Sequence, residues 1–232
     1  MVKVQAVLQG RLSSSRLPGK VLADIQGAPM IIRQLERISL AKTIDQVTVA
    51  ISENASDDRL FQVLSDFGAD VRRGSLSDVA SRYYDVIATD SPQNVVRLTA
   101  DCPLCDWDVI DQVIEAHLET GADYTSNILK RTFPRGLDVE VFQADAFCAV
   151  FEKGLVPYEA EHVTPALYDP NSDFKLHSVE SASDDSDLRW TVDYPDDLEF
   201  VRYVYSELYA SGLPFESSLI HSLERASSPK PQ

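Results

Sequence analysis

Cysteine and long apolar runs are scarce in this 232-residue sequence. The three cysteines cannot all pair with one another, so we expect reduced thiols rather than a disulfide framework. No stretch approaches the roughly 20 apolar residues that a membrane span needs. The first residues alternate as a strand does instead of forming a signal-peptide core. These features predict a soluble, cytoplasmic protein without membrane insertion.

Positive charge is also in short supply. The sequence holds 21 Lys and Arg against 37 Asp and Glu, which gives a formal net charge of −16. Nucleic-acid affinity depends largely on cations that replace counterions at the phosphates, so we do not expect polymeric DNA or RNA as a partner. The length, with 44% hydrophobic residues, suits a single domain with its own core. We assign that domain to residues 1–225 and a flexible tail to residues 226–232.

Several familiar nucleotide and metal motifs are missing. No G-x-G-x-x-G follows the first predicted strand, which removes the main signal of a dinucleotide site. A Walker A loop would need glycine at the position of Ser14 and serine or threonine at the position of Val21. Cys102 and Cys105 have the C-x-x-C spacing, but no second pair of ligands accompanies them. We therefore favour ordinary buried thiols there over a metal or redox site.

Asp106-Trp107-Asp108 has the D-x-D form that many metal-dependent glycosyltransferases use. This motif falls where an amphipathic helix is predicted to begin, and an aspartate at such a position commonly accepts hydrogen bonds from backbone N–H groups. We therefore favour a helix cap at this motif over a glycosyltransferase metal site.

Strand and helix patterns alternate along the chain. Short apolar runs predict strands at residues 2–8, 47–52, 70–72, 94–99, 123–126, 137–142, 174–179 and 188–192. Apolar residues near a 3.6-residue spacing predict helices near 29–38, 57–67, 78–87, 106–120, 143–153, 159–168, 195–208 and 217–225. This alternation predicts an α/β fold of three layers (αβα), with helices on both faces of a mostly parallel, Rossmann-like sheet. In such sheets, ligands bind beyond the carboxyl ends of the strands.

A cationic loop follows the first predicted strand. The segment from Met1 to Ala23 contains no aspartate or glutamate, although the chain as a whole is strongly acidic. Arg11, Arg16 and Lys20 lie in this loop among glycines and serines. Guanidinium groups, an ammonium group and free backbone N–H groups at the end of a strand suit a polyphosphate. We favour this phosphate-binding role over the alternative of a solvated basic loop.

Two aspartates come directly after predicted strands. Asp101 follows residues 94–99, and Asp193 follows residues 188–192. Two carboxylates at that edge, facing a cationic phosphate loop, can hold Mg²⁺ together with phosphate oxygens. The alternative is that both aspartates cap turns or helix starts, as we expect Asp196 and Asp197 to do.

The loop and several later segments resemble one known family. The resemblance is carried by residues 9–21 (QGRLSSSRLPGKV), 73–75 with 78–79 and 82–83, 97–103 (RLTADCP), 134–140 (PRGLDVE), 161–165 (EHVTP) and 189–193 (RWTVD). They resemble the cytidylyltransferases that activate acidic sugars, the 3-deoxy-manno-octulosonate and acylneuraminate cytidylyltransferases. Among these, they are most similar to the branch that contains the spore-coat polysaccharide biosynthesis protein F family. The resemblance spans nearly the whole chain.

This resemblance implies a Mg²⁺-dependent nucleotidyltransferase with a defined set of site residues. Arg11, Arg16 and Lys20 would bind the triphosphate, and Asp101 and Asp193 would bind the metal. The wider nucleotide-binding set would add Gln9, Gly10, Ser14, Arg73 and Arg82, and the acceptor side would consist of Arg135, Asp138, Glu140, Glu161 and His162. For three of these residues an alternative stays open. Arg73 and Arg82 either touch nucleotide or brace the loop, and His162 is either a functional or a structural imidazole. The chain departs from the family pattern at Gly10, where alanine is usual, at Leu12-Ser13, where Met-Gly is more typical, and at Tyr194, where a smaller residue is common.

The implied reaction is transfer of CMP from CTP to an acidic sugar of the nonulosonic or octulosonic type, with release of pyrophosphate, for cell-surface glycan synthesis. Two alternatives remain. The chain could transfer a nucleotide to a phosphorylated sugar or alcohol, or it could be a nucleotide-binding protein of the same fold without turnover. Since dimers are common in these families, a homodimer is also expected.

Overall fold

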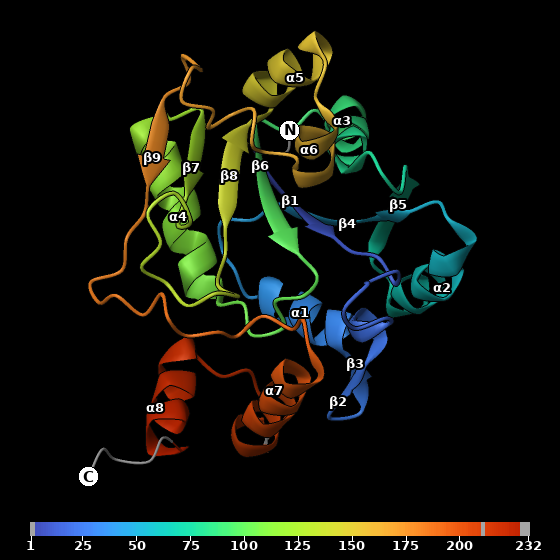
Figure 1. Ribbon diagram of the computed structural model, residues 1–232, viewed down its shortest axis with the longest axis vertical. Helices are drawn as coiled ribbons and strands as arrows, with labels where there is room; N and C mark the ends of the chain where they lie inside the picture. The colour runs from blue at the N-terminus through green and yellow to red at the C-terminus, as the bar shows by residue number, and fades with distance from the viewer. Residues whose placement is uncertain (1–2, 210–211, 228–232) are drawn as a thin grey trace.

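The computed structural model describes residues 3–209 and 212–227. A seven-stranded sheet, in the order β5-β4-β1-β6-β8-β7-β9, forms the centre of the molecule (Figure 1). Four neighbouring strands are parallel: β5 (Asp70–Gly74), β4 (Gln46–Ser52), β1 (Val4–Gln9) and β6 (Asn94–Thr99). β8 (Glu140–Gln143) runs antiparallel to both β6 and β7 (Tyr124–Ser126), and β9 (Leu176–Ser178) pairs in parallel with β7. The sheet is therefore mostly parallel, as predicted.

Helices cover both faces of this sheet, because successive strand residues point to opposite sides. Ala6 and Leu8 belong to one hydrophobic core, and Val7 between them belongs to the other. The first core receives side chains from α1 (Met30–Ile38), α2 (Asp58–Phe67), α4 (Trp107–Thr120), α7 (Pro195–Leu208) and α8 (Ser217–Ser227). The second receives them from α3 (Val79–Asp90) and α5 (Ala144–Lys153), and from Val163 and Leu167, which follow α6 (Pro157–His162). The predicted three-layer α/β class is confirmed (Figure 1).

Short elements between the main ones shape the edge where the parallel strands end. The 3-10 helix η1 (Lys20–Leu22) and the small hairpin of β2 (Asp24–Ile25) and β3 (Ala28–Pro29) follow β1, and the 3-10 helix η2 (Ala55–Asp57) follows β4. The register aligns Gln9 with Ala50 on one side and Thr99 on the other. The ends of the three central strands therefore lie together, which is where the sequence predicts the ligand site.

The D-x-D motif is a helix cap, as we favoured. Asp106 is buried, and its Oδ1 accepts hydrogen bonds from the backbone N–H groups of Asp108 and Val109 at the start of α4. Its Oδ2 accepts another from Ser217 N at 2.8 Å. Asp106 is therefore fully used by the fold, because its two oxygens hold together helix starts that are 111 residues apart in sequence.

Three predicted elements differ from those observed. Residues 188–192 form no strand: Arg135 and Arg189 make an isolated bridge, and beyond it Val192 N donates instead to Asp101 O. The segment divides its backbone hydrogen bonds between two loops, so no ladder develops. The strand predicted at 137–142 begins only at Glu140. The helix predicted at 159–168 covers 157–162, because Val163 adopts a positive φ of 71°.

The ends of the described chain also bear on the predictions. Helix α8 extends two residues past its predicted end, to Ser227, so the first two residues of the predicted tail are helical. The rest of that tail, 228–232, lies outside the described residues, as does the first residue of the strand predicted at 2–8. Cys102, Cys105 and Cys148 are free thiols, as expected. Among the described residues, no helix has the length and apolar character that crossing a bilayer demands.

Candidate active site

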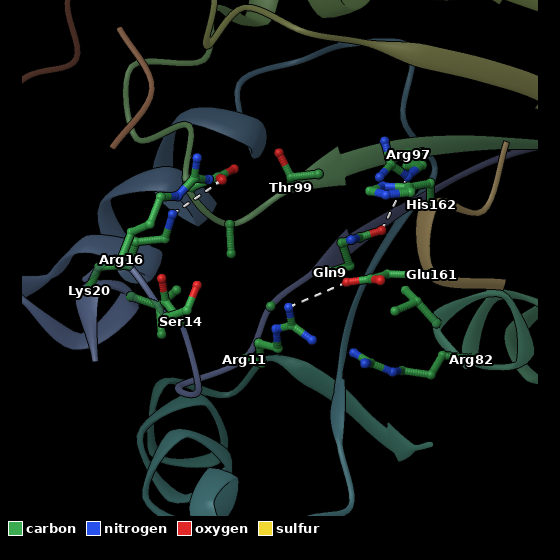
Figure 2. Close-up of a pocket in the computed structure, with 16 residues that line it drawn as sticks. Gln9, Arg11, Ser14, Arg16, Lys20, Arg82, Arg97, Thr99, Glu161 and His162 are labelled. Carbon is green, nitrogen blue, oxygen red and sulfur yellow. Dashed lines mark hydrogen bonds and ion pairs between the residues drawn. The ribbon is translucent and has the colours of Figure 1, made fainter. Parts of the chain in front are cut away.

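A polar cavity of about 300 Å³ opens at the carboxyl ends of β1 and β6 (Figure 2). The loop after β1, the start of α3 and the end of α6 complete its walls. The predicted site residues that line it are Gln9, Gly10, Arg11, Ser14, Arg16, Lys20, Arg82, Asp101, Glu161 and His162. Residues from four separate segments of the sequence thus converge on one pocket, which the fold places where doubly wound sheets bind ligands. The lining also includes six residues that the sequence did not single out: Ser15, Val21, Val79, Arg97, Thr99 and Ala100.

The backbone of the loop after β1 is held in a defined shape. Leu12 N donates to the buried carboxylate of Asp57 at 2.7 Å, and Leu12 O accepts from Gly19 N at 3.0 Å. Gly19 has a φ of 73°, the left-handed region that glycine adopts without strain. At Gly10, where the family usually has alanine, a Cβ would lie 3.0 Å from the Ala100 Cβ. The departure at Gly10 therefore avoids a tight contact with the strand end of β6.

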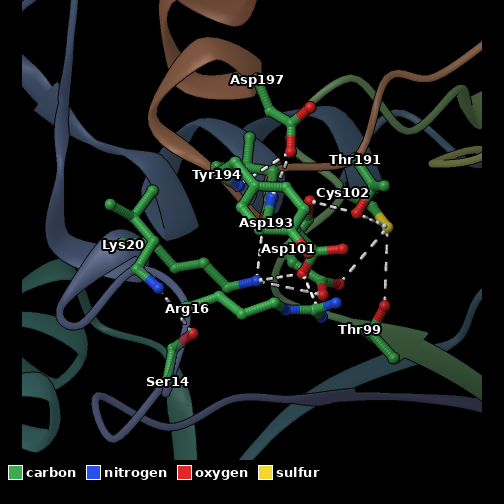
Figure 3. Close-up of polar contacts among 12 residues, drawn as sticks. Ser14, Arg16, Lys20, Thr99, Asp101, Cys102, Thr191, Asp193, Tyr194 and Asp197 are labelled. Carbon is green, nitrogen blue, oxygen red and sulfur yellow. Dashed lines mark hydrogen bonds and ion pairs between the residues drawn. The ribbon is translucent and has the colours of Figure 1, made fainter.

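Lys20 lies at the centre of the polar contacts at one end of the pocket (Figure 3). Its side chain is only 9% exposed. The Nζ atom donates to Val192 O at 2.5 Å, to Asp193 Oδ1 at 3.2 Å and to Asp101 Oδ2 at 3.3 Å. The sequence predicts that Asp101 and Asp193 share one cation. They do so in the structure, where the cation is the ammonium group of Lys20.

Asp193 is the most heavily paired carboxylate of the site. Besides Lys20, it accepts a hydrogen bond from Arg16 at 2.6 Å on Oδ1 and one from Arg189 at 2.7 Å on Oδ2. Burial alone would raise the pKa of Asp193, but the hydrogen bonds from Arg189 and Lys20 and the charges of Lys20 and Arg16 hold it below the ordinary value. Asp193 is therefore ionised and shared by three cationic side chains.

Neighbouring residues fix the position of Asp193. Asp197 accepts hydrogen bonds from the backbone N–H groups of Asp193 and Tyr194, as a residue in a first helical turn can. Asp197 also pairs with Arg189 at 3.1 Å. Tyr194, one of the departures from the family pattern, has the Arg16 guanidinium 5.5 Å from its ring centroid. Its larger ring thus adds a cation–π contact to the cationic loop.

Arg11 and Arg82, two of the arginines that line the pocket, differ in exposure and in partners. Arg11 is 41% exposed and makes a loose ion pair with Glu161 at 3.7 Å, so it is free to turn toward an anion. Arg82 is buried, and it donates to the carbonyl oxygens of Ser75, Ala50 and Leu76. Burial lowers the pKa of Arg82 from its ordinary value. Within the described residues, no carboxylate forms a salt bridge with it, so Arg82 braces the loop at 75–76 and places a charge without a direct ion pair at the pocket wall.

Gln9 presents a side chain of fixed polarity to the pocket. Its Oε1 accepts hydrogen bonds from Tyr83 Oη at 2.9 Å and from Arg97 Nε at 3.2 Å. Since an arginine nitrogen can only donate, the amide oxygen must face Arg97, and the amide nitrogen lies on the opposite side. Figure 2 shows this arrangement. Gln9 therefore offers N–H donors to a bound molecule.

Five predicted residues lie outside the lining of the cavity: Asp193, whose contacts with Lys20 and Arg16 are given above, and Arg73, Arg135, Asp138 and Glu140. Arg73 braces the loop after β4 through Ser52 O, Asn54 O and a 2.7 Å ion pair with Asp58. Arg135 is exposed, and its main chain pairs with residue 189. Asp138 accepts two hydrogen bonds from Arg131, at 2.5 and 3.0 Å.

Glu140 lies away from the acceptor side. The expectation that it contacts the acceptor is wrong, because Glu140 is buried, with an exposed fraction of 3%, at the start of β8. Its carboxylate forms an ion pair with Arg97 and accepts hydrogen bonds from Tyr124 at 2.7 Å and Thr164 at 2.5 Å. Glu140 therefore acts on the pocket only through Arg97. No sequence signal in Arg97 alone could have revealed this, since its partner lies 43 residues away.

The site is suited to a metal only in combination with a ligand. Among the described residues, no three or more His, Cys, Asp or Glu side chains gather where they could hold a metal ion. Asp101 and Asp193 supply two carboxylates around one cationic position. Two carboxylates completed by phosphate oxygens and water are a common way to bind Mg²⁺, and they leave the ion weakly held when phosphate is absent.

The chain matches proteins of known families over most of its length. The family model described as "Cytidylyltransferase" matches residues 5–206. The spore coat polysaccharide biosynthesis protein SpsF of Bacillus subtilis is 28% identical over 208 residues, which are 87% of this chain and 85% of that protein. The mitochondrial 3-deoxy-manno-octulosonate cytidylyltransferase of Arabidopsis thaliana is 29% identical over an alignment of 234 positions, which covers 94% of this chain and 70% of that one.

A solved structure extends the similarity to three dimensions. The structure of a cytidylyltransferase from Leptospira borgpetersenii superposes on this one with a TM-score of 0.91 and 29% sequence identity. The superposition covers 100% of both chains. The cationic loop, Asp101 and Asp193 all fall within the residues that the family model matches. The chain therefore belongs to the cytidylyltransferase family, as its sequence motifs predict.

Proposed function

We propose that this protein transfers CMP from CTP to a hydroxyl group of an acidic sugar and releases pyrophosphate. The observation that carries the proposal is the convergence of Arg11, Arg16 and Lys20 with Asp101 in one polar cavity at the strand ends. Three cations along one loop match the charge of a triphosphate, and a carboxylate beside them matches a metal bound to that triphosphate. Membership of the cytidylyltransferase family points to cytosine as the base.

In the proposed reaction, an oxygen of the acceptor forms a bond to the α-phosphorus of CTP. The bond from that phosphorus to the oxygen that bridges to the β-phosphorus breaks, pyrophosphate leaves with the bonding electrons, and water takes up the hydroxyl proton. Such transfers depend on positioning and on neutralising charge more than on covalent help from the protein. Arg11, Arg16 and Lys20 would stabilise the charge that develops on pyrophosphate.

Mg²⁺ is the metal we propose for this reaction. Asp101 and Asp193 would hold it, because both carboxylates already contact a single cationic group in the structure and oxygen ligands suit this ion. When bound, Mg²⁺ would supply Lewis-acid neutralisation of phosphate charge. Arg189 supports this assignment, since it donates to Asp193 Oδ2 while Lys20 contacts Oδ1, and Asp197 holds the Asp193 backbone by accepting from its N–H group.

The acceptor side of the pocket is the wall that carries Thr99, Glu161 and His162. These side chains offer hydrogen-bonding groups that suit a polyhydroxylated molecule. The relatives support an acidic sugar, because one acts on 3-deoxy-manno-octulosonate and another serves spore coat polysaccharide synthesis by their names. The charge of Arg82, on the helix α3 that packs against α6, fits an anionic ligand.

The test is release of pyrophosphate with Mg²⁺, each of the four nucleoside triphosphates, and a panel of acceptors. The panel contains 3-deoxy-manno-octulosonate, its 8-amino derivative, an acylneuraminate, a hexose 1-phosphate and a polyol phosphate. We expect turnover with CTP and a carboxylate-bearing sugar. Turnover with a phosphorylated acceptor alone would instead support nucleotide transfer to a phosphate, and no turnover in a protein that binds CTP would support a binding role.

A matched pair of variants ties the activity to this pocket. R11M should lower turnover by about 10²–10³-fold, because it removes one donor to developing phosphate charge. R59M removes the same charge from the exposed face of α2, outside the pocket, and should retain wild-type turnover. Equal activity of R11M and wild type would contradict the placement of the triphosphate on this loop.

A further inference from the structure

We propose that Lys20 occupies, in the nucleotide-free protein, the position that a divalent cation takes once a triphosphate is bound. The metal site would then exist only in the presence of nucleotide. This inference rests on the proposed function for the identity of the nucleotide, and it goes beyond that function by setting the order in which the site is filled.

The first support is the burial and the bonding of the ammonium group. The Lys20 side chain is 9% exposed, and all three donors of its Nζ atom have partners: Val192 O, Asp193 Oδ1 and Asp101 Oδ2. An ammonium group has three N–H bonds, so Lys20 is fully satisfied by the protein alone. Its ammonium group is therefore bound within the protein and is not exposed to solvent as a free phosphate-binding group would be.

The second support is the occupation of the carboxylates. Both oxygens of Asp193 already accept from cations, Oδ1 from Lys20 and Arg16 and Oδ2 from Arg189. The Asp193 side chain is 11% exposed, which leaves little room for an additional ligand. A dication could use this carboxylate only by displacing Lys20, Arg16 or both.

The charges explain why nucleotide would reverse this arrangement. A dication placed beside the Lys20 ammonium would be repelled by it, in a site where burial weakens solvent screening. A triphosphate offers Lys20 and Arg16 alternative oxygens of higher charge, and Arg16, which is 53% exposed, can turn to them easily. Once the two cations move to phosphate, Asp101 and Asp193 become free to bind metal.

This arrangement couples the two ligands thermodynamically. If nucleotide raises the affinity of the site for metal, metal must raise the affinity of the site for nucleotide by the same factor. The residues that separate the two states are Lys20 and Arg16, so removing either charge should weaken the coupling. The proposal therefore predicts metal binding in the absence of nucleotide in variants of these two residues.

The experiment uses Mn²⁺ as the probe, titrated into the full-length protein without nucleotide and followed by the electron paramagnetic resonance signal of the free ion. We expect the wild type to bind Mn²⁺ weakly, with no contribution from Asp193. K20M, which keeps the length of the side chain and removes its charge, should bind one Mn²⁺ at least about tenfold more tightly. The double variant K20M/D193N should lose that gain.

A control and a second variant keep the test decisive. K153M removes a lysine from the exposed end of α5, outside the pocket, and should leave Mn²⁺ binding unchanged, which separates the effect from a general change in net charge. R16Q alters a half-exposed side chain, so it should fold even if K20M does not, and it should show a smaller gain than K20M.

The proposal is overturned if wild type binds Mn²⁺ without nucleotide as tightly as K20M and if D193N abolishes that binding. It is equally overturned if neither K20M nor R16Q gains affinity. A parallel calorimetric titration with CTP separates this result from the proposed function: absence of CTP binding contradicts the function, whereas the Mn²⁺ titrations without nucleotide judge the role of Lys20 by themselves.

Discussion

The amide of Gln9 shows how one side chain can be given a direction by its neighbours. Tyr83 and Arg97 both donate to its oxygen, and Arg97 is itself held by the buried Glu140. Fixing a rotatable side chain in advance saves the entropy that binding would otherwise cost. The N–H donors of Gln9 are therefore available to a ligand without rearrangement.

Q9E tests this polarity with an almost unchanged shape. One glutamate oxygen can still accept from Tyr83 and Arg97, but the atom facing the pocket changes from a donor to a charged acceptor. We expect Q9E to lower kcat/KM for the nucleotidyl transfer by at least about tenfold, since a lost hydrogen bond and an added repulsion both oppose anionic ligands. Steady-state pyrophosphate release measures the effect.

The control for Q9E is Q93E, which makes the same substitution on an exposed loop before β6. Q93E should keep wild-type kcat/KM and an unchanged melting temperature. If Q9E had the same kcat/KM as Q93E, the amide nitrogen of Gln9 would not face a reacting ligand.

At the scale of elements, the crossing of segments 134–137 and 188–193 places Asp193. Trp190 N donates to Arg135 O at 2.7 Å, and Arg135 N donates to Leu188 O at 3.0 Å. Gly136 has a φ of 107°, and a Cβ at this position would lie 2.6 Å from the Trp190 carbonyl carbon. Only glycine allows the two backbones to approach this closely.

We expect G136A to reduce the free energy of unfolding by about 3 kcal/mol or more, because a backbone atom cannot give way as a flexible side chain can. Chemical denaturation measures this change. G68A, at a φ of 86° with nothing within 4 Å of the added Cβ, should cost only about 1 kcal/mol. Equal costs of the two substitutions would contradict the close crossing as the cause.

Helix α4 is tied to the sheet by a neutral imidazole. His117 Nε2 lies 3.1 Å from Asn94 Oδ1, and Nδ1 lies 3.0 Å from Thr125 Oγ1. The Asn94 amide nitrogen donates to Lys3 O, so its oxygen faces the ring and Nε2 carries the proton. Burial lowers the pKa of His117 from 6.5 to about 4.

This pKa gives a pH dependence of stability with a defined sign. Between pH 6.5 and about 4 the unfolded chain binds a proton at His117 that the folded chain does not, so stability is complete above pH 6.5 and falls as the pH is lowered. The loss should reach about 3 kcal/mol near pH 4. Denaturation curves of wild type and H117Q test it: the difference between the two should shrink across this range as wild type loses its advantage. A constant difference would contradict the prediction.

The whole molecule carries a net charge of −16, yet its polar cavity is lined by the arginines and the lysine of the β1 loop. A ligand that binds only the folded state stabilises it by mass action. With Mg²⁺ present, CTP at a hundred times its Kd should raise the melting temperature by about 5–10 °C, given a gain of about 2.7 kcal/mol and the size of this chain. A thermal shift assay measures it.

The comparison for that assay is GTP at the same concentration, which supplies the same triphosphate with a different base. A clearly smaller shift with GTP is expected if the pocket also reads the base. Equal shifts would mean that the triphosphate alone is recognised. At the scale of the whole molecule, three statements stay predictions: the extent of the domain, the tail beyond Ser227 and the homodimer.

Local patterns were sufficient to predict most of the elements and the cationic loop after β1. The alternation of apolar residues depends on neighbours in sequence, so the strands around Leu8 and Leu98 and the cap at Asp106 were all predictable. Where a segment takes its hydrogen bonds from two distant loops, as at 188–192, the pattern predicts a strand that tertiary contacts prevent.

By itself, the sequence determined the class of fold, the cationic loop and the two aspartates, because charge and apolar spacing are local properties that survive folding. The tertiary structure decided which of these groups share contacts. It gave Glu140 to Arg97 instead of to the acceptor, and it placed the ammonium of Lys20 between Asp101 and Asp193. Pairings of this kind join residues up to 173 positions apart, so they depend on how the strands end side by side and not on any spacing along the chain.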